Sequence, residues 1–268
     1  MKNNNDPIKQ ENRKAIPKFI LMSVLGLIGG GILGLALVFL GLENFGDTLV
    51  AAGVSFTINV APWLLIALPI VELAVCLPIY FGAKKRLAAW DGEDEEASGL
   101  IETRLSVCLW ITSMVNVLNF FLLAALFSGF IDMAGNPMRT SPVKFFGPLA
   151  AFLVTLYVGA VLQQKLVDAT KKMNPEKHGS VYDTKFHKTW MESCDEAEKA
   201  VIGQCAFKAY QAVTLTCLIL WAVLALGGMF FSWGFMPAMT VCIIWGVSQS
   251  VYCYWCLKLS NPGSTSAL

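Results

Sequence analysis

Long runs of apolar residues dominate the chain and predict membrane-spanning helices. A helix needs about 20 apolar residues to cross about 30 Å of hydrocarbon. Gly234 and Pro237 divide the last uncharged run, because glycine suits a turn and proline suits the first turn of a new helix. The pattern predicts an all-α membrane helix bundle of six transmembrane helices in three hairpins, at about 19–41, 61–82, 105–129, 145–165, 209–231 and 237–257. Residues 48–61 either extend the second span or lie in the membrane interface.

Positive charges lie almost entirely on one side of these spans. Of 20 Lys and Arg residues, only Arg139 and Lys144 fall in predicted outer loops. Lys- and Arg-rich loops are cytoplasmic in membrane proteins. We therefore expect a multi-pass plasma membrane protein with both termini in the cytoplasm, forming a single membrane domain over residues 1–268. The predicted cytoplasmic segments are 1–18, 83–104, 166–208 and 258–268.

Composition narrows the class of protein further. Charged residues make up 15% of the chain and hydrophobic residues 56%, and the formal net charge is +1. Soluble domains carry about 25% charged and 45–50% apolar residues. An ordinary soluble enzyme and a basic nucleic-acid-binding domain are therefore excluded, and we expect a protein in the lipid bilayer with no direct nucleic-acid binding.

A short pattern recurs at an offset of 100 residues. Each copy has a tryptophan, then an acidic pair and an alanine, and then runs into a membrane span. We expect cytoplasmic amphipathic helices before spans three and five, with the tryptophans either packed within a cytoplasmic layer or exposed as anchors for a cytosolic protein. The candidate cytoplasmic interface residues are Trp90, Glu95, Glu96, Trp190, Asp195 and Glu196.

Capping chemistry places the starts of these helices. Ser193 and Glu196 fit a capping box, so we expect the second helix to begin at Ser193. Asp91 or Asp94 is expected to cap the first copy. The acidic residues then lie in each first turn, where the helix dipole favours negative charge. A capped helix of this kind needs no partner, so the pattern is also consistent with a purely structural role.

Glu72 is the one acidic residue deep inside a predicted span, between Pro69 and Pro78. A charge at the bilayer centre costs about 2.5–3.5 kcal/mol on insertion scales, which makes such residues functional candidates. Asn116 and Asn119 share one face of span three and are the polar candidates that accompany it. Glu72 either lines a cation or proton path or is a protonated structural group hydrogen-bonded to one of these amides.

Glycines in the first span suggest close helix packing. Gly26, Gly30 and Gly34 recur every four residues and form a small-residue seam on one helix face. An internal contact is favoured over a dimer contact. The same segment formally matches a dinucleotide-binding glycine pattern, but no strand precedes it, so that interpretation fails.

Catalytic and metal-binding patterns are weak. His178 and His187 are nine residues apart in one predicted loop, and no span contains histidine, which excludes intramembrane metalloprotease chemistry. None of the eight cysteines falls in a predicted outer loop, so structural disulfides are not expected. Cys253 and Cys256 form a lone pair better explained by juxtamembrane packing or palmitoylation than by redox chemistry. We therefore expect no enzyme activity, cofactor or metal.

The segment 179–199, which contains GSVYDTKF and then WMESCDEAEK, resembles a known family when taken with the acidic residues 94–96. It is similar to a family of Firmicute six-span membrane proteins labelled only as a domain of unknown function. Members are often encoded beside a helix-turn-helix regulator, so the resemblance implies a transcriptional regulator as partner. It implies no catalytic residues.

Three functions follow from these patterns. The first is a non-enzymatic membrane protein whose cytoplasmic layer binds a partner, such as a transcriptional regulator. The alternative is a transporter or an ABC-type permease component that uses Glu72 and binds an ATPase subunit. A membrane enzyme ranks last, because no paired catalytic groups are present.

Overall fold

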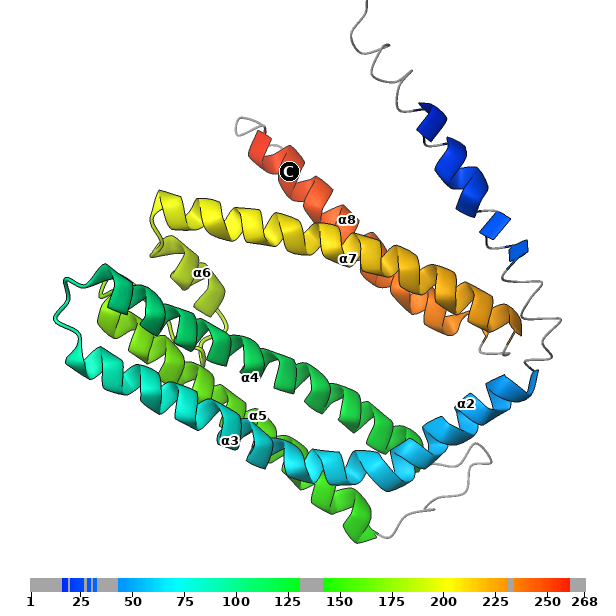
Figure 1. The fold of residues 1–268 in the computed structure, drawn as a ribbon, viewed down its shortest axis with the longest axis horizontal. Helices are drawn as coiled ribbons and strands as arrows, with labels where there is room; N and C mark the ends of the chain where they lie inside the picture. Colours follow the sequence, from blue (N-terminus) through cyan, green and yellow to red (C-terminus); the bar gives the residue numbers. More distant parts are fainter. Residues whose placement is uncertain are drawn as a thin grey trace, which may run out of the picture. The chain divides into compact units, whose positions relative to one another are not determined.

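The computed structural model describes residues 16–18, 20–26, 28–29, 31–32, 43–130, 142–230 and 234–260. Within these ranges the chain is helical and contains no strand. Figure 1 shows the long helices and the short α6. Their bounds are α2 Glu43–Ser55, the π-helix η1 Phe56–Val60, α3 Ala61–Ala89, α4 Glu95–Phe130, α5 Pro142–Met173, α6 Phe186–Glu192, α7 Glu196–Phe230 and α8 Met236–Ser260.

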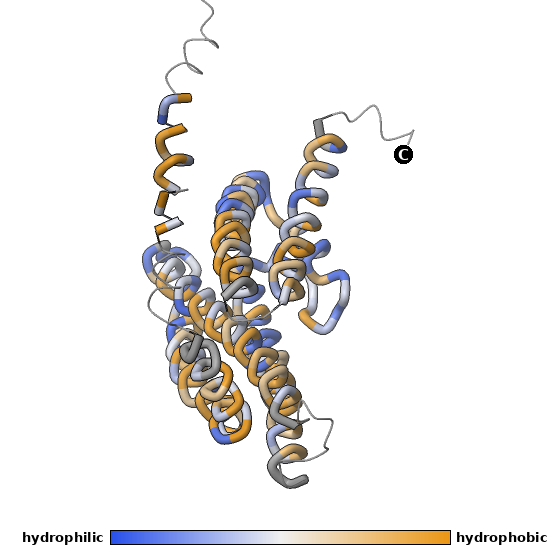
Figure 2. The backbone as a smooth tube through the Cα atoms, turned by 90° about the vertical axis from the view of Figure 1, so that its right-hand side faces the viewer, coloured by the Kyte–Doolittle hydropathy of each residue, from blue (hydrophilic) through white to orange (hydrophobic). Residues whose placement is uncertain are grey.

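Among the described residues, five helices are long and apolar enough to cross a membrane, at Val50–Ala89, Glu96–Ser128, Phe145–Met173, Glu196–Gly228 and Met236–Lys258. They correspond to the second to sixth predicted spans. Hydrophobic residues make up most of each of these helices (Figure 2). About half of the predicted first span at 19–41 lies outside the described residues. Gly30 and Gly34 of the glycine seam lie outside them as well, and only Gly26 is described.

The structure resolves two points about helix boundaries: the state of residues 48–61 and the lead-in helices before spans three and five. Residues 48–61 continue as helix through α2 and η1 into α3, so they extend the helix of span two. The expected lead-in helices before spans three and five are not separate elements in the structure. They are the first turns of α4 and α7, each of which continues into its span without a break.

The chain divides into two compact units. One covers Ala51–Phe207 and the other covers Met1–Val50 with Lys208–Leu268. In the second unit, α7 and α8 meet through Tyr210. Its hydroxyl hydrogen-bonds to Gln249 Oε1 at 2.5 Å, and its ring stacks on Tyr252 with centroids 4.4 Å apart.

The Ala51–Phe207 unit is built on a bundle of α3, α4 and α5, which all pack against one another (Figure 1). Its buried residues form two apolar clusters. The Leu105 cluster contains Cys76, Ala83, Ile101, Leu105, Cys108, Leu162, Leu166, Ala169 and Met173. The Leu65 cluster contains Ala61, Leu65, Leu68, Leu122, Ala125, Leu126, Phe145 and Phe152.

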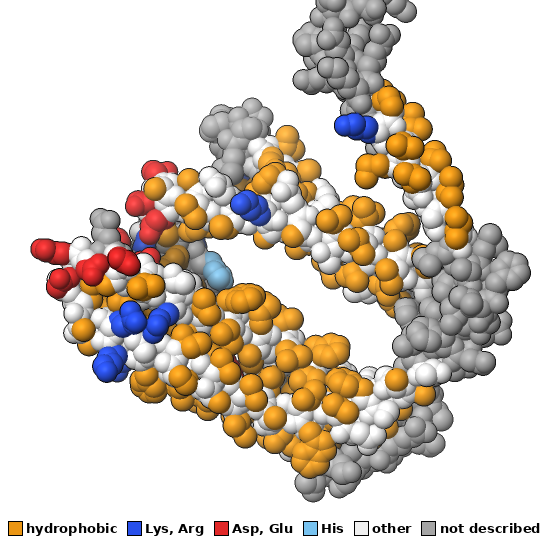
Figure 3. Space-filling view, in the orientation of Figure 1, with side chains coloured by type: hydrophobic (Ala, Val, Ile, Leu, Met, Phe, Trp, Pro, Cys, Tyr) orange, Lys and Arg blue, Asp and Glu red, His pale blue; other side chains and the backbone are white. Residues whose placement is uncertain are grey.

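Large apolar side chains cover the outside of this bundle, as the space-filling view shows (Figure 3). Trp63 is 66% exposed and Tyr157 is 71% exposed. Polar side chains are instead buried inside the bundle, including Thr112, Asn119 and Thr155. This distribution suits a bundle whose solvent is lipid, because apolar side chains then face hydrocarbon and polar groups pair inside.

Aspartates begin α4 and α7. Asp94 Oδ1 accepts hydrogen bonds from the backbone N–H groups of Glu96 and Ala97, both at 3.0 Å. Asp195 Oδ1 accepts from the Glu198 N–H at 2.7 Å, and Glu198 Oε2 accepts from the Asp195 N–H at 3.0 Å. The second arrangement is a reciprocal capping box. Asp94 is thus confirmed as one of the two caps predicted for the first copy.

The predicted helix start at Ser193 is wrong. Ser193 follows the end of α6, and its hydroxyl donates to the Trp190 carbonyl at 2.7 Å. The serine therefore closes the turn after α6, and Asp195 caps α7 two residues later. The capping box pairs Asp195 with Glu198 rather than Ser193 with Glu196, although Glu196 still lies in the first turn, as expected.

Substituting the cap should loosen the start of α7. Asp195→Ala removes the acceptor for the Glu198 N–H, and loss of such a cap costs about 1 kcal/mol. We expect faster hydrogen–deuterium exchange in the first turn of α7, measured by mass spectrometry in detergent. Ser193→Ala is the matched control, and it should leave exchange in that turn unchanged. Equal acceleration by both variants would restore Ser193 as the cap.

Candidate intramembrane ion site

Glu72 lies near the middle of the helical run Val50–Ala89 and is 1% exposed. Pro69 precedes it by three residues and Pro78 follows it by six. Both of its carboxylate oxygens are buried and have no hydrogen-bond partner in the described part of the chain. A buried polar atom of this kind costs about 1–3 kcal/mol when left unsatisfied. The side chain therefore lacks the hydrogen bonds that a structural role would give it.

Asn116 on α4 and Gly159 on α5 lie next to Glu72. If Gly159 carried a Cβ, it would lie 3.4 Å from Glu72 Oε1 and 3.4 Å from both amide atoms of Asn116. The glycine therefore leaves room where three helices bring a carboxylate and an amide together. A side chain at this position would fill that space.

Asn119 lies one turn along α4. Its amide nitrogen donates to the Phe152 carbonyl on α5 at 3.2 Å, while its Oδ1 has no partner among the described residues. Asn116 Oδ1 is buried without a partner as well. The hydrogen bond from an asparagine to Glu72, which a structural role would require, is not formed in this structure.

Buried hydroxyls and thiols lie on α3, α4 and α5, the three helices that meet at Glu72. Thr112 donates to the Cys108 carbonyl at 2.9 Å and lies 3.8 Å from the Cys76 sulfur. Thr155 donates to the Ala151 carbonyl at 3.0 Å.

Thr112, Thr155 and Gly159 were not identified from the sequence as residues of this site. Thr112 had a visible signal, because it lies four residues before Asn116 on the same face of α4. Gly159 had none.

Apolar clusters lie on either side of this polar centre along the bundle. On α3, Leu68 of the Leu65 cluster precedes Glu72, and Cys76 of the Leu105 cluster follows it. On α4 the polar residues lie between Leu105 and Leu122, which belong to opposite clusters. Water reaching Glu72 along the bundle axis must therefore pass one apolar cluster or the other.

The unpartnered atoms at this centre are all hydrogen-bond acceptors. They are Glu72 Oε1, Glu72 Oε2, Asn116 Oδ1 and Asn119 Oδ1. Acceptors without donors attract a cation or a donor group. Across the described residues, no three His, Cys, Asp or Glu side chains come together as a metal-binding group. The chemistry that fits is therefore coordination by carboxylate and amide oxygens.

The predicted interface residues lie at one end of the same unit, and several of them make local contacts. Trp90 is half-buried, and its indole N–H donates to the Asp94 carbonyl at 3.0 Å. Trp190 is also half-buried, with its ring centroid 5.7 Å from that of Phe186. The two tryptophans line different grooves. Both are thus partly packed, and neither is a fully exposed anchor.

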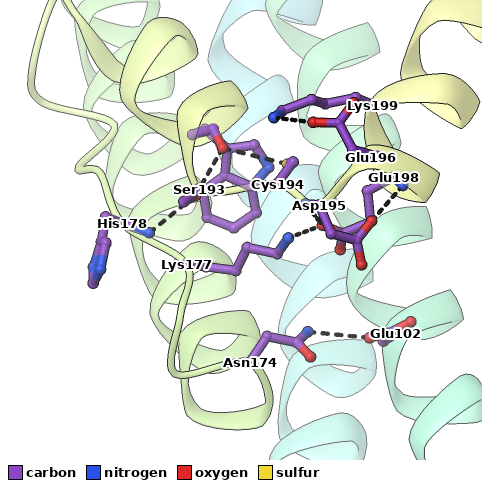
Figure 4. Close-up of polar contacts among 11 residues, drawn as sticks. Glu102, Asn174, Lys177, His178, Ser193, Cys194, Asp195, Glu196, Glu198 and Lys199 are labelled. Atoms are coloured by element: carbon purple, nitrogen blue, oxygen red, sulfur yellow. Dashed lines mark hydrogen bonds and ion pairs between the residues drawn. The ribbon is translucent and has the colours of Figure 1, made fainter.

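Among the acids, Glu96 and Glu196 are exposed, and Glu196 pairs with Lys199 at 3.0 Å (Figure 4). The Glu95 side chain lies outside the described side chains. Asp91 accepts hydrogen bonds from the N–H groups of Glu93 and Asp94, which lower the pKa of its carboxyl. Among the candidate acids whose side chains are described, Glu96 and Glu196 therefore cap no helix.

Lys177 holds the segment after α5 against the start of α7. Its side chain is 4% exposed, and its ammonium forms an ion pair with Glu198 of the capping box (Figure 4). Burial lowers the pKa of the Lys177 ammonium, but the hydrogen bond and charge of Glu198 outweigh burial and raise the pKa above its ordinary value. Asn174 donates to Glu102 of α4 at 3.2 Å nearby. Both residues border a groove of about 430 Å³ that is also lined by Trp190.

A substitution at Glu72 should raise the stability of the cation-free protein. Glu72→Met replaces two unsatisfied buried oxygens with an apolar chain, which we expect to stabilise the fold by about 1–3 kcal/mol. Asn119→Leu is the matched control and should stabilise less, because it removes one unsatisfied oxygen but also the hydrogen bond that the amide nitrogen donates to the Phe152 carbonyl. Unfolding in SDS followed by circular dichroism, in choline buffer without alkali metal ions, measures both. Destabilisation by Glu72→Met would indicate a structural carboxyl.

Comparison with known proteins identifies the family. Residues 13–254 match the family model described as "Protein of unknown function (DUF3169)". No curated protein and no solved structure matches the chain. The match covers most of the sequence, including α3, α4, α5 and the acidic helix starts. The chain therefore belongs to the DUF3169 family of proteins of unknown function.

Proposed function

We propose that this protein moves a small cation across the membrane and that Glu72 binds the cation on the way. One observation carries the proposal: Glu72 is fully buried in an apolar helical run, and neither carboxylate oxygen has a protein partner. Burying an unpaired charge is expensive. A carboxyl retained in such a place is explained by a ligand that neutralises it during the working cycle.

The apolar clusters give the site a barrier on each side. A transport site must be reached from one side of the membrane at a time. The Leu65 and Leu105 clusters close the bundle on either side of Glu72 and hold the site in an occluded state. Opening one cluster while the other stays packed would expose Glu72 to one side only.

Two prolines make α3 a suitable moving part. Pro69 and Pro78 each lack the N–H that would bond to the carbonyl four residues earlier, those of Leu65 and Ala74. Glu72 lies between these two weak points of the helix. Bending at one proline would move one end of α3 relative to Glu72, and bending at the other would move the opposite end.

The flux of protons and of sodium tests this function. We expect purified protein in liposomes to carry one of these ions down an imposed gradient, followed with a pH-sensitive dye and with radioactive sodium. Glu72→Gln removes the negative charge at nearly constant volume, so it should reduce the flux to the level of empty liposomes. The assay needs no knowledge of any co-transported solute.

Glu96→Gln serves as the matched control, because it neutralises an exposed acid on α4 and should keep the flux of the parent protein. Loss of flux in both variants would indicate a general effect of charge. Equal flux in Glu72→Gln and the parent protein would contradict the proposal.

A second function is favoured by the acidic end of the Ala51–Phe207 unit. Figure 3 shows acidic side chains gathered where α4 and α7 begin. The positive-inside rule puts these helix starts in the cytoplasm. We propose this surface as a docking site for a cytosolic protein with a basic face, such as a transcriptional regulator. The exposed acids that form it are Asp91, Glu93, Asp94, Glu96, Asp195 and Glu196.

Charge reversal tests this docking surface. Glu96→Lys combined with Glu196→Lys reverses two exposed charges while keeping the caps Asp94 and Asp195. We expect a basic cytosolic protein to co-purify with the parent protein in mild detergent and to be lost from the double variant. Glu176→Lys, which reverses an exposed acid that belongs to neither helix start, should retain that protein. Retention by the double variant would contradict the docking surface.

A further inference from the structure

We infer that the cation held at Glu72 is a dehydrated sodium ion, coordinated directly by oxygens of Glu72 and Asn116. This inference rests on the proposed function and names its ion. The juxtaposition on which it depends is that of α3, α4 and α5 at Gly159, where the carboxylate and the amide both lie 3.4 Å from the position of a Cβ.

The number of unsatisfied oxygens favours a metal cation over a proton. Beside Gly159, both oxygens of Glu72 and the Oδ1 of Asn116 have no partner among the described residues, and Asn119 Oδ1, one turn along α4, has none either. A proton adds a single O–H donor, which can satisfy one further acceptor. A metal cation attracts several oxygens at once, and hard alkali cations prefer carboxylate and carbonyl oxygens.

The space at Gly159 favours a small ion. A methyl group on this glycine would already contact Glu72 Oε1 and the Asn116 amide at 3.4 Å. The opening between these groups is therefore on the scale of one atom. Such a space suits a bare metal ion and excludes an organic ammonium compound with its carbon substituents.

Charge balance favours a single positive charge. Glu72 and Lys177 are the charged side chains among the buried residues of the described chain, and Lys177 is paired with Glu198. One carboxylate therefore faces the site and can neutralise one positive charge. A divalent ion would keep an uncompensated charge in a low-dielectric interior, which is costly.

The other titratable groups near Glu72 are thiols. Cys76 lies one turn along α3, and Cys108 faces it from α4, while the described part of α5 contributes no titratable group beside Gly159. The Cys108 thiol donates to the Cys76 carbonyl at 3.7 Å, and the Cys76 sulfur lies 3.8 Å from the Thr112 hydroxyl. Both sulfurs therefore have partners of their own, which leaves coordination to oxygen.

Protection from a carbodiimide tests the inference on the full chain. Dicyclohexylcarbodiimide enters apolar sites and adds to a protonated carboxyl, and the product rearranges to a stable N-acylurea that mass spectrometry locates. We expect Glu72 to be labelled in choline buffer. Sodium at about ten times its dissociation constant should slow the labelling about tenfold, because the free site falls to that extent by mass action.

Two variants assign the ligands. Asn116→Ala removes a coordinating oxygen, and Gly159→Ala places a methyl against the site while all the oxygens remain. Both should still be labelled at Glu72, but sodium should protect them far less at the concentration that protects the parent protein. Asn116→Ser keeps an uncharged oxygen at the position and should retain more of the protection than Asn116→Ala.

Sodium-dependent protection that weakens in Asn116→Ala supports the inference. Labelling that changes with pH but is unaffected by sodium would overturn it and would identify a proton as the ion. Labelling unaffected by both would overturn it as well. The flux assay is separate: flux of protons that depends on Glu72, without sodium protection, leaves the transport function standing, whereas protection without any flux removes that function and keeps the sodium site.

Discussion

Hydrocarbon offers no hydrogen-bond partners, and this constraint shapes the α3–α5 bundle. Its large apolar side chains lie on the outside, and Thr112 and Thr155 bond to carbonyls of their own helices. Glu72 departs from this rule, because neither of its oxygens has a partner in the described chain. Asn116 Oδ1 and Asn119 Oδ1 also lack partners among the described residues. This set of buried acceptors, with a carboxyl among them, is the reason for assigning Glu72 to a ligand.

The rest of the unit can be understood through this site. The Leu65 and Leu105 clusters stabilise the bundle by burying apolar side chains, and they also separate Glu72 from both ends of the bundle. Pro69 and Pro78 weaken α3 on either side of the carboxyl. Beyond the Leu105 cluster, Lys177 and the Asp195 capping box hold the start of α7 beside the bundle. The two apolar clusters and the two weak points of α3 therefore lie on either side of the buried Glu72, and the contacts that hold α7 lie beyond one of these clusters.

Hydrophobic patterning predicted the five long helices, and the intramembrane acid was evident because charge is rare in such runs. The face shared by Asn116 and Asn119 followed from helical spacing. Helical spacing could not predict the hydrogen bonds of these two asparagines. Asn119 donates to the Phe152 carbonyl because of the register of α5 against α4, which the sequence of one helix does not contain. Gly159 had no signal for the same reason. The start of α7 was misplaced by two residues, because Ser193 and Asp195 are both good caps and only the turn after α6 decides between them.

The most direct test of the account is an infrared difference spectrum of the purified protein with and without sodium. Sodium binding at Glu72 should displace the carboxyl proton into the buffer and leave a carboxylate, so we expect loss of a carboxylic acid C=O band when sodium is added. That band should be missing from Glu72→Gln and present in Glu96→Gln. An unchanged carboxyl region on adding sodium, or the same difference band in Glu72→Gln, would contradict the account.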